Sequence, residues 1–222
     1  MNETQITGRI PTCFNSTFIA LIPKVDNPLS LNDFRPISLC NCTYKVVSKV
    51  IAGRFKRVLL EHISKEQFGF LEGRLIHKAI GVAQEGIHSM KVKNIKGAIF
   101  KIDLAKAFEK VSWLYIRFLL THMAFDIVFI RWIMSCITTV SFLVLINGAA
   151  SPLFHAEHGI RQGFPLSPLL FLLVAEGLSH VLKEAIRLGN FIGLQLAQNL
   201  NISHFIFVDD ILILCSGSVR DL

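Results

Sequence analysis

Two carboxylates stand side by side in the stretch His204-Phe205-Ile206-Phe207-Val208-Asp209-Asp210-Ile211-Leu212-Ile213-Leu214. The runs on either side are short and rich in β-branched and aromatic residues, which is typical of strands. Because Asp tolerates turn geometry, the acidic pair is expected to form the turn of a β-hairpin. A plain surface turn is the alternative interpretation of such a pair.

The charge of this pair calls for a neutralising partner. Two like charges at the tip of an apolar hairpin are costly to bury unless a cation lies beside them. No Lys or Arg occurs between Leu188 and Val219, so the cation is expected to come from elsewhere. A divalent metal ion is the economical candidate, and oxygen ligands alone suit a hard ion such as Mg²⁺.

The composition favours a folded protein with a polyanionic partner. The chain has 222 residues, enough for one large domain or two subdomains, and 52% of them are hydrophobic, which excludes a disordered chain. The formal net charge of +7 favours nucleic acid first and an anionic membrane second. Five cysteines without any Cys-x-x-Cys spacing indicate free thiols in a reducing compartment, not a disulfide framework or a zinc site.

The segment 125–146 is apolar enough to require a membrane check. Asp126 and Arg131 interrupt it, and both charges would be expensive in lipid. Its second half, from Ile137 to Ile146, is β-branched and favours a strand over a continuing helix. We therefore expect two elements of a soluble core, with a membrane span as the alternative. The polar N-terminus resembles no signal peptide, so secretion is not expected.

Hydrophobic periodicity and turn residues predict an α+β fold in which an antiparallel sheet is backed by helices. Strands are expected at 17–23, 34–39 and 97–103, helices at 43–62, 75–93, 112–123, 127–136 and 165–188, and hairpins at 138–159 and 202–214. In the helix 43–62, the predicted apolar face includes Val46, Val50 and Val58 as well as Ile51 and Phe55. Its cationic face could lie along a phosphate backbone or be simply solvated.

A third acid follows another predicted strand, in Lys101-Ile102-Asp103-Leu104-Ala105-Lys106-Ala107-Phe108-Glu109. If that strand lies beside the acidic hairpin, Asp103 converges with Asp209 and Asp210. Three carboxylates at one sheet edge can hold two Mg²⁺ ions roughly 3.5–4 Å apart, the separation suited to in-line phosphoryl transfer. On its own, Asp103 could equally be an acid at a helix start.

Two further stretches contain residues suited to binding anions. In Gly159-Ile160-Arg161-Gln162-Gly163-Phe164-Pro165-Leu166-Ser167-Pro168, a helix start flanked by Arg161 can face an anion or a base pair. In Asp33-Phe34-Arg35-Pro36-Ile37-Ser38-Leu39, Arg35 could clamp a triphosphate. The alternatives are an ordinary loop entering a helix and an ordinary surface arginine.

Taken in order, these stretches resemble the reverse transcriptase of non-LTR (LINE-type) retrotransposons, especially the plant kind. The matching segments are Ile22-Pro23-Lys24 with Asp33 to Leu39, Lys101 to Phe108, Gly159 to Pro168, and Phe207-Val208-Asp209-Asp210. The resemblance implies the fingers and palm of a right-hand polymerase, with an antiparallel palm sheet and the thumb missing. It implies a loosely ordered remnant at 1–16, a fingers-like part at 17–96 and a truncated palm at 97–222.

The resemblance also implies a catalytic mechanism. Asp103, Asp209 and Asp210 would be the catalytic residues and would bind two Mg²⁺ ions, with Mn²⁺ as a substitute. Phe108 falls where the family places an aromatic side chain that rejects a ribose 2′-hydroxyl. The implied function is RNA-directed DNA polymerisation by two-metal nucleotidyl transfer to a primer 3′-hydroxyl.

Further residues would bind the substrates. Gln162 and Gly163 resemble the pair that positions the template base and the incoming nucleotide, and Arg35 and Lys24 resemble cations that hold the triphosphate. The implied partners are an RNA template, a DNA primer and deoxynucleoside triphosphates, without a membrane. The implied location is nuclear or cytoplasmic.

Some residues depart from the family pattern. Phe164 stands where these elements usually have Asp, and Glu109 where Asp is also usual. The loop at 69–74 is a variant of the usual one, and the chain stops twelve residues after Asp210. The alternative is therefore a catalytically silent, degenerate fragment that at most binds nucleic acid.

Overall fold

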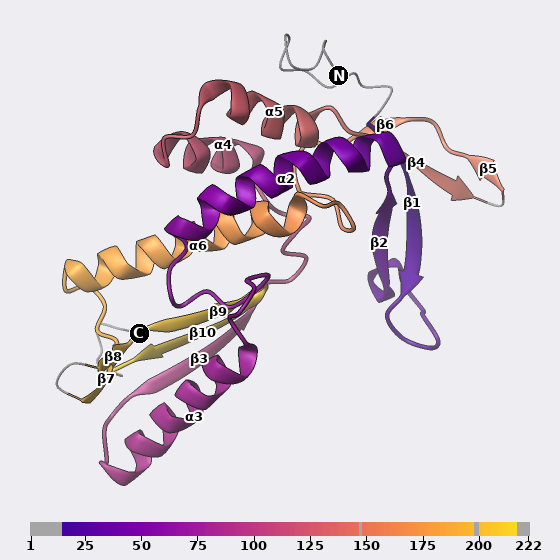
Figure 1. Ribbon diagram of the computed structural model, residues 1–222. Helices are drawn as coiled ribbons and strands as arrows, with labels where there is room; N and C mark the ends of the chain where they lie inside the picture. Colours follow the sequence, from indigo (N-terminus) through magenta and orange to yellow (C-terminus); the bar gives the residue numbers. More distant parts are fainter. Residues whose placement is uncertain (1–14, 147, 198–199, 217–222) are drawn as a thin grey trace. The chain divides into compact units, whose positions relative to one another are not determined.

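The computed structural model describes residues 15–146, 148–197 and 200–216 (Figure 1). The predicted remnant at 1–16 therefore lies almost entirely outside the described residues. The chain divides into two compact units. Unit 1 consists of Met1–Leu59 and Phe108–Phe171, and unit 2 of Leu60–Ala107 and Leu172–Leu222.

Unit 1 contains a mixed sheet in which both antiparallel and parallel pairs occur. Its strands are β1 (Ser16–Pro23), β2 (Phe34–Leu39), β4 (Ser141–Ile146), β5 (Ala149–Ala150) and β6 (Phe154–His155). The order is β2-β1-β4-β5, and β6 also pairs with β4. Strand β1 runs antiparallel to β2 but parallel to β4, so this sheet is mixed, whereas the sequence predicted an antiparallel sheet without such a parallel pair. The 3₁₀ turn η2 (Leu31–Asp33) precedes β2.

The helices of unit 1 begin at residues that cap them. Helix α4 (Trp113–His122) starts after Ser112, whose hydroxyl accepts a hydrogen bond from the Tyr115 N–H. Helix α5 (Ile127–Thr138) starts after Asp126, whose carboxylate accepts from two backbone N–H groups. Helix α5 and strand β4 confirm that the apolar segment consists of two elements. In the part of the chain that the structure describes, no helix is long and apolar enough to span a bilayer.

Helix α2 (Cys42–His62) is rotated relative to the face that its valines predicted. Ile51 and Phe55 are buried as expected, and the ring of Phe55 packs against those of Phe125 and Phe129. The other buried residues are Tyr44, Ser48, Ala52 and Leu59. By contrast, Val46, Val50 and Val58 are 56%, 46% and 44% exposed. The large Tyr and Phe rings define the buried stripe, and the valines lie on the outward face instead.

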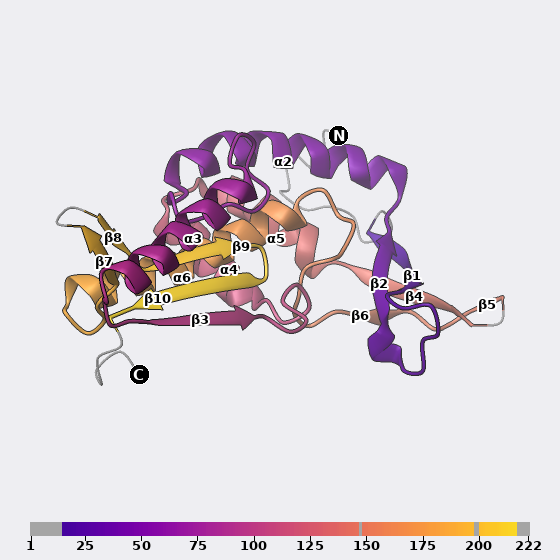
Figure 2. The ribbon, with the colours of Figure 1, turned by 90° about the horizontal axis from the view of Figure 1, so that it is seen from below.

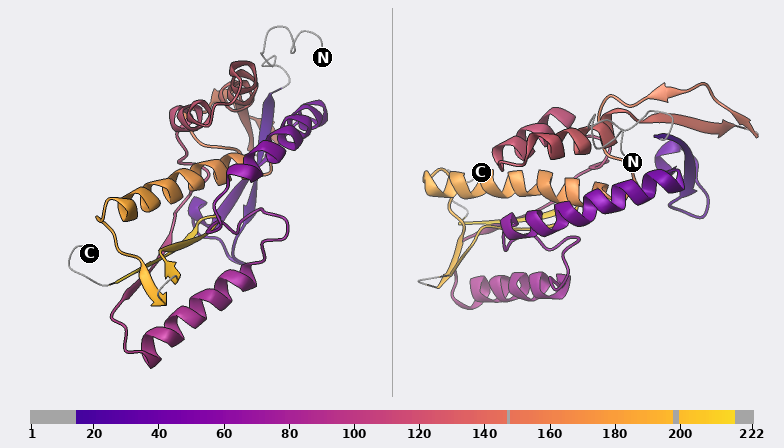
Figure 3. Two further views of the ribbon diagram at one scale, coloured as in Figure 1. Left: turned by 60° about the vertical axis from the view of Figure 1, so that its left-hand side comes forward. Right: turned by 45° about the horizontal axis from the view of Figure 1, so that its top comes forward.

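Unit 2 contains an antiparallel sheet with a helix on each face (Figure 3). Its strands are β3 (Ala98–Asp103), β9 (His204–Phe207) and β10 (Asp210–Cys215), in the order β3-β10-β9. Helix α6 (Ser167–Arg187) packs on one face through Ala175 and Leu178, which contact Ile206 and Ile211. Helix α3 (Ile76–Val92) lies on the other face.

A short pair of strands, β7 (Leu194–Ala197) and β8 (Leu200–Ile202), was not predicted. Leu194 and Leu196 are buried in the core of unit 2 together with Leu214. The alternation of these two leucines with Gln195 was the sequence signal that could have predicted strand β7. The hairpin β9–β10 was predicted and is present (Figure 2). Its turn is formed by Val208 and Asp209. Asp210 is the first residue of β10, so the expectation that both acids form the turn is only half right.

Candidate active site

Three acids meet at one end of the unit 2 sheet. Asp103 ends β3 and is the cross-strand partner of Asp210, which begins β10. Asp209 occupies the turn next to them, and its carbonyl accepts a hydrogen bond from the Leu104 N–H at 3.0 Å. All three acids are exposed. The register therefore brings together the residues that were predicted to converge, while their role as metal ligands stays a prediction.

A lysine from the neighbouring strand neutralises part of this negative charge. The Lys101 ammonium lies 3.1 Å from the Asp210 carboxylate. Its hydrogen bond to Asp210 raises the pKa of Lys101, and the charges of Asp210 and Asp103 contribute. The expectation that a cation from elsewhere in the chain or its surroundings neutralises the pair is met in part by Lys101 of β3, which was not considered as the partner.

The chemistry of the donor set fits a hard divalent ion. Three carboxylates offer only oxygen atoms, which Mg²⁺ prefers. Within the described residues, no three His, Cys, Asp or Glu side chains form a ready-made set of metal ligands. An ion at Asp210 would have to compete with the Lys101 ammonium for the same carboxylate.

The turn that contains Asp209 is strained. Val208 has a φ of +56°, a left-handed conformation that is unfavourable for a β-branched residue. A hairpin turn with positive φ at its first central position normally has Gly there. Such a conformation costs on the order of 1–3 kcal/mol and persists only where surrounding structure holds it.

The surrounding structure is the loop that joins α2 to α3, called here the 63–74 loop. The Ile206 N–H donates to the Glu66 carbonyl and the Phe68 N–H donates to the Ile206 carbonyl, both at 2.9 Å. The loop thus pairs with β9 along the edge that β10 leaves free. At Gly69, an added Cβ would lie 2.8 Å from both Val208 Cγ2 and Val208 N, so the loop touches the strained residue itself.

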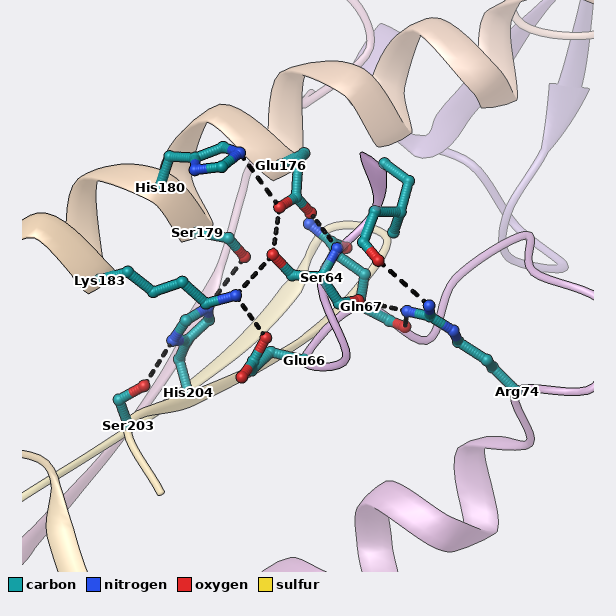
Figure 4. A network of polar contacts seen from close by, with 11 residues as sticks. Ser64, Glu66, Gln67, Arg74, Glu176, Ser179, His180, Lys183, Ser203 and His204 are labelled. Atoms are coloured by element: carbon teal, nitrogen blue, oxygen red, sulfur yellow. Dashed lines mark hydrogen bonds and ion pairs between the residues drawn. The ribbon is translucent and has the colours of Figure 1, made fainter. Parts of the chain in front are cut away.

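Arg74 holds the 63–74 loop in shape (Figure 4). One guanidinium nitrogen donates to the carbonyls of Ser64 and Gln67, the latter at 2.9 Å. The other nitrogen donates to the Ile63 carbonyl at 3.2 Å. The planar guanidinium of Arg74, at the end of the loop, is thereby bonded to residues at the start of the loop. The compact ammonium of a lysine could not make these hydrogen bonds with the same geometry.

A polar cluster attaches the loop to helix α6 (Figure 4). The Glu176 carboxylate accepts hydrogen bonds from the Ser64 N–H at 3.1 Å and from the Ser64 hydroxyl. The Lys183 ammonium donates to the Ser64 hydroxyl at 2.6 Å and pairs with Glu66 at 2.8 Å. Burial raises the pKa of Glu176 although these hydrogen bonds oppose the shift. The cluster was missed from the sequence, although Glu176 stands out as a carboxylate that directly follows the long apolar run at the start of α6.

His204 attaches the start of β9 to the same helix. It is fully buried, and its Nε2 lies 2.8 Å from the Ser179 hydroxyl while Nδ1 lies 2.8 Å from the Ser203 hydroxyl. Burial lowers the pKa of His204 to about 4, so the imidazole is neutral at pH 7. A neutral ring can donate through one nitrogen and accept through the other, which matches its two hydroxyl partners.

The predicted triphosphate-binding cations lie in unit 1. Arg35 is exposed on β2, opposite Ile22 of β1. The Lys24 ammonium donates to the Asn32 carbonyl at 2.8 Å, and its backbone N–H donates to the Asp33 carbonyl. Both residues therefore belong to the β1–β2 hairpin, with Lys24 turned towards the connecting loop.

Gln162 and Gly163 lie against β2, and Phe108 is hydrogen-bonded to the start of the same loop. The Gln162 carbonyl accepts from the Ser38 N–H at 3.1 Å, and a Cβ at Gly163 would lie 3.3 Å from Ile37. The Phe108 carbonyl accepts from the N–H of the residue after Gly159, at 2.8 Å. The Phe108 ring stacks on Phe171 with centroids 4.7 Å apart. Unit 1 thus contains all five predicted substrate-binding residues.

Arg161, which could have faced an anion or belonged to an ordinary loop, has its hydrogen-bond partners inside unit 1. It is buried, and one nitrogen donates to the Tyr44 hydroxyl at 2.9 Å and to the Cys136 carbonyl at 3.1 Å. Its guanidinium lies 4.2 Å from the ring centroid of Phe164 and 4.9 Å from that of Tyr44. The unusual Phe164 therefore has a structural role, because its ring covers a buried cation.

Residues 22–221 match the family model described as reverse transcriptase (RNA-dependent DNA polymerase). The chain belongs to the reverse transcriptase family. This reverse transcriptase chain is 28% identical over 184 residues to the transposon TX1 uncharacterized 149 kDa protein of Xenopus laevis, which covers 83% of the chain and 14% of that protein. It is 23% identical over 215 residues to a retrovirus-related Pol polyprotein from the type-1 retrotransposable element R2 of Popillia japonica, covering 96% of the chain and 29% of the polyprotein.

Two further similarities concern a shorter segment and the fold alone. An uncharacterized mitochondrial protein of Arabidopsis thaliana is 42% identical over 69 residues, 31% of this chain and 57% of that protein. The structure of apo telomerase from Candida tropicalis, truncated from its C-terminal domain, superposes with a TM-score of 0.65 at 15% identity, covering 95% of this chain and 45% of the telomerase. The mixed α+β fold is therefore shared with telomerase. The reverse transcriptase chain spans less than a third of the TX1 and R2 proteins.

Proposed function

We propose that this chain is the fingers and palm of a non-LTR retrotransposon reverse transcriptase that adds deoxynucleotides to a primer 3′-hydroxyl on an RNA template. The observation that carries the proposal is the position of Asp103 opposite Asp210, with Asp209 in the adjoining turn. Three carboxylates at the end of one sheet are the groups that two-metal nucleotidyl transfer requires. Family membership supports the same reaction.

Each residue has a defined task in this proposal. Asp103, Asp209 and Asp210 would hold two Mg²⁺ ions, which would lower the pKa of the attacking hydroxyl and stabilise the leaving pyrophosphate. Arg35 and Lys24 would bind the triphosphate, since both cations belong to the exposed β1–β2 hairpin.

Nucleotide selection would depend on the remaining unit 1 residues. The Phe108 ring would exclude a 2′-hydroxyl, and its stacking on Phe171 would keep it from moving aside. Gln162 and Gly163 would position the base pair, since their backbone is fixed against β2. The proposal places the protein in the nucleus or the cytoplasm, where its nucleic acid substrates occur.

Primer extension on an RNA template with Mg²⁺ tests this function. The Asp209→Asn variant should lose at least about 100-fold in rate, because it removes a carboxylate from the set that would bind the ions. The matched control is Asp26→Asn, which alters an exposed acid in the β1–β2 connection and should retain the wild-type rate. Extension by Asp209→Asn at the control rate would refute the assignment.

A second candidate function is nucleic acid binding without catalysis. It is favoured by the Lys101–Asp210 ion pair, because the ammonium occupies one carboxylate of the proposed metal set. This candidate predicts salt-sensitive binding of RNA without nucleotide incorporation. Incorporation by the 222-residue chain excludes it.

A further inference from the structure

We propose that the 63–74 loop is a positioning element for Asp209, and that Arg74 and Gly69 are its positioning residues. The proposal rests on the proposed function, because it concerns the carboxylate assigned to catalysis there. None of the loop residues needs to touch substrate. Their effect would pass through β9 and Val208 to the acid.

The first step is that the turn needs external support. Val208 adopts a left-handed conformation that its side chain disfavours, and it directly precedes Asp209. A two-residue turn that relaxed would change the direction of the Asp209 side chain relative to Asp103. The position of the Asp209 carboxylate therefore depends on the contacts that hold Val208 in its conformation.

The second step is that the loop provides this support from the outer edge of the hairpin. Two hydrogen bonds join it to Ile206, on either side of that residue, at 2.9 Å each. Gly69 then lies against the Val208 backbone nitrogen and Cγ2, where even a methyl group would overlap. On the other side, the Leu104 N–H donates to the Asp209 carbonyl. The turn is thus held between the loop and the end of β3.

The third step is that the loop is shaped by Arg74 and attached to α6. Arg74 donates to three carbonyls within the loop, and Ser64 is hydrogen-bonded to Glu176 and Lys183 (Figure 4). The 63–74 loop therefore transmits the position of helix α6 to the hairpin. If Arg74 loses its forked geometry, the loop can shift away from Val208 while the sheet remains intact.

The test uses Arg74→Lys, which keeps the charge and removes the fork. The matched control is Arg57→Lys, a change on the exposed side of α2. Residue-resolved amide exchange is measured on the wild type and both variants. We expect exchange at residues 206–210 to become at least about tenfold faster in Arg74→Lys. Exchange at Ile213, Leu214 and Cys215, which pair with β3, should change by less than about twofold.

A uniform acceleration along the whole of β9 and β10 would mean that Arg74 merely contributes to stability, and it would overturn the proposal. Unchanged exchange at residues 206–210 would also overturn it. Gly69→Ala is the second variant, because it alters only the contact with Val208. It should produce the same selective acceleration even if Arg74→Lys fails to fold.

The exchange measurement does not require polymerase activity. Wild-type protein that fails to extend a primer would therefore refute the proposed function and leave the role of the loop to be decided by exchange. In an active protein, Gly69→Ala should lower kcat about 10–100-fold, as expected for misplaced catalytic groups, with primer–template affinity within about twofold of wild type. Equal losses in kcat and affinity would contradict a positioning role.

Discussion

Arg161 is a buried cation that is stabilised by two aromatic rings and two acceptors. Its hydroxyl partner, Tyr44, lies 117 residues away in the chain. Local sequence therefore showed only an arginine between glycines near a helix start, a pattern that also occurs at anion sites. Phe164, which departs from the family pattern, is explained by the same contacts.

The substitution Phe164→Leu should destabilise the protein by about 1–3 kcal/mol, because it removes a ring from the buried guanidinium and leaves space in the core. Urea unfolding measures this difference. Phe118→Leu is the matched control, since Phe118 is 59% exposed, and it should change stability by less than about 0.5 kcal/mol. Equal stability of the two variants would contradict the role assigned to Phe164.

His204 should make stability depend on pH in the acid range. Its folded-state pKa of about 4 is below the usual value of 6.5, so the unfolded chain takes up a proton first as pH falls. The stability that the neutral ring contributes is complete above about pH 6.5 and is lost as pH falls towards 4. Between pH 7 and pH 5 the loss is about 2 kcal/mol.

Urea unfolding of the wild type and of His204→Gln at pH 7 and pH 5 checks this expectation. Glutamine does not titrate, so the variant should lose about 2 kcal/mol less than the wild type over that interval. His155→Gln, in which a histidine of unit 1 is replaced, serves as the control and should behave like the wild type. Identical pH dependence in wild type and His204→Gln would contradict the buried neutral imidazole.

At the scale of elements, helix α2 has an outward face that mixes cations and valines. Lys49 and Arg54 are exposed there beside Val50. If this face follows a phosphate backbone, the double variant Lys49→Ala with Arg54→Ala should reduce the slope of log K against log salt for single-stranded RNA by about 1. The matched control alters Lys78 and Lys91 of α3. Equal slopes for both double variants would indicate a solvated face.

Most elements could be predicted because their signals are local. Hydrophobic periodicity and turn residues predicted helices α3, α4 and α6 within a residue or two, and short apolar runs between turn residues predicted β1, β3 and the hairpin β9–β10. The rotation of α2 could not be predicted, since Val and Phe are both apolar and only packing against α5 distinguishes them. The hairpin expected at 138–159 is confirmed, because β4 pairs antiparallel with both β5 and β6. Its second strand is divided into two segments of two residues each, and that division was not predicted.

In the candidate site, too, some residues could be predicted from local signals and others could not. The three acids could be chosen because each follows or precedes a strand, and the pairing of β3 with β10 brings them together. Lys101 was overlooked as their partner, although it lies two residues from Asp103 and therefore on the same face of its strand. Glu176, Lys183 and Ser64 could not be connected, since 112 residues separate Glu176 from Ser64.

At the scale of the whole molecule, neither unit is a continuous segment. Strand β3 belongs to the first half of the chain, whereas its partner β10 is the last strand that the structure describes. Strand β1 likewise pairs with β4, more than 100 residues later. A piece consisting of residues 1–107 would lack β4 and β10, and would therefore leave both sheets incomplete.

We therefore expect residues 1–107, produced alone, to show no cooperative thermal unfolding, whereas the intact chain should show it. Circular dichroism with temperature measures both. The physical reason is that residues 1–107 alone would expose apolar faces of their strands that β4 and β10 no longer cover. A sharp transition in residues 1–107 would show that the first half can form a stable core by itself.

Strand β3 also has a consequence for the behaviour of the protein in concentrated solution. In the three-stranded sheet that the structure describes, β3 is an outer strand, and Phe100 and Ile102 on it are each 39% exposed. Unpaired amide and carbonyl groups beside apolar side chains form a template for adding a strand from another molecule. The isolated chain should therefore tend to form intermolecular sheets and aggregate as its concentration rises, and a lysine introduced at Ile102 should delay the onset of light scattering.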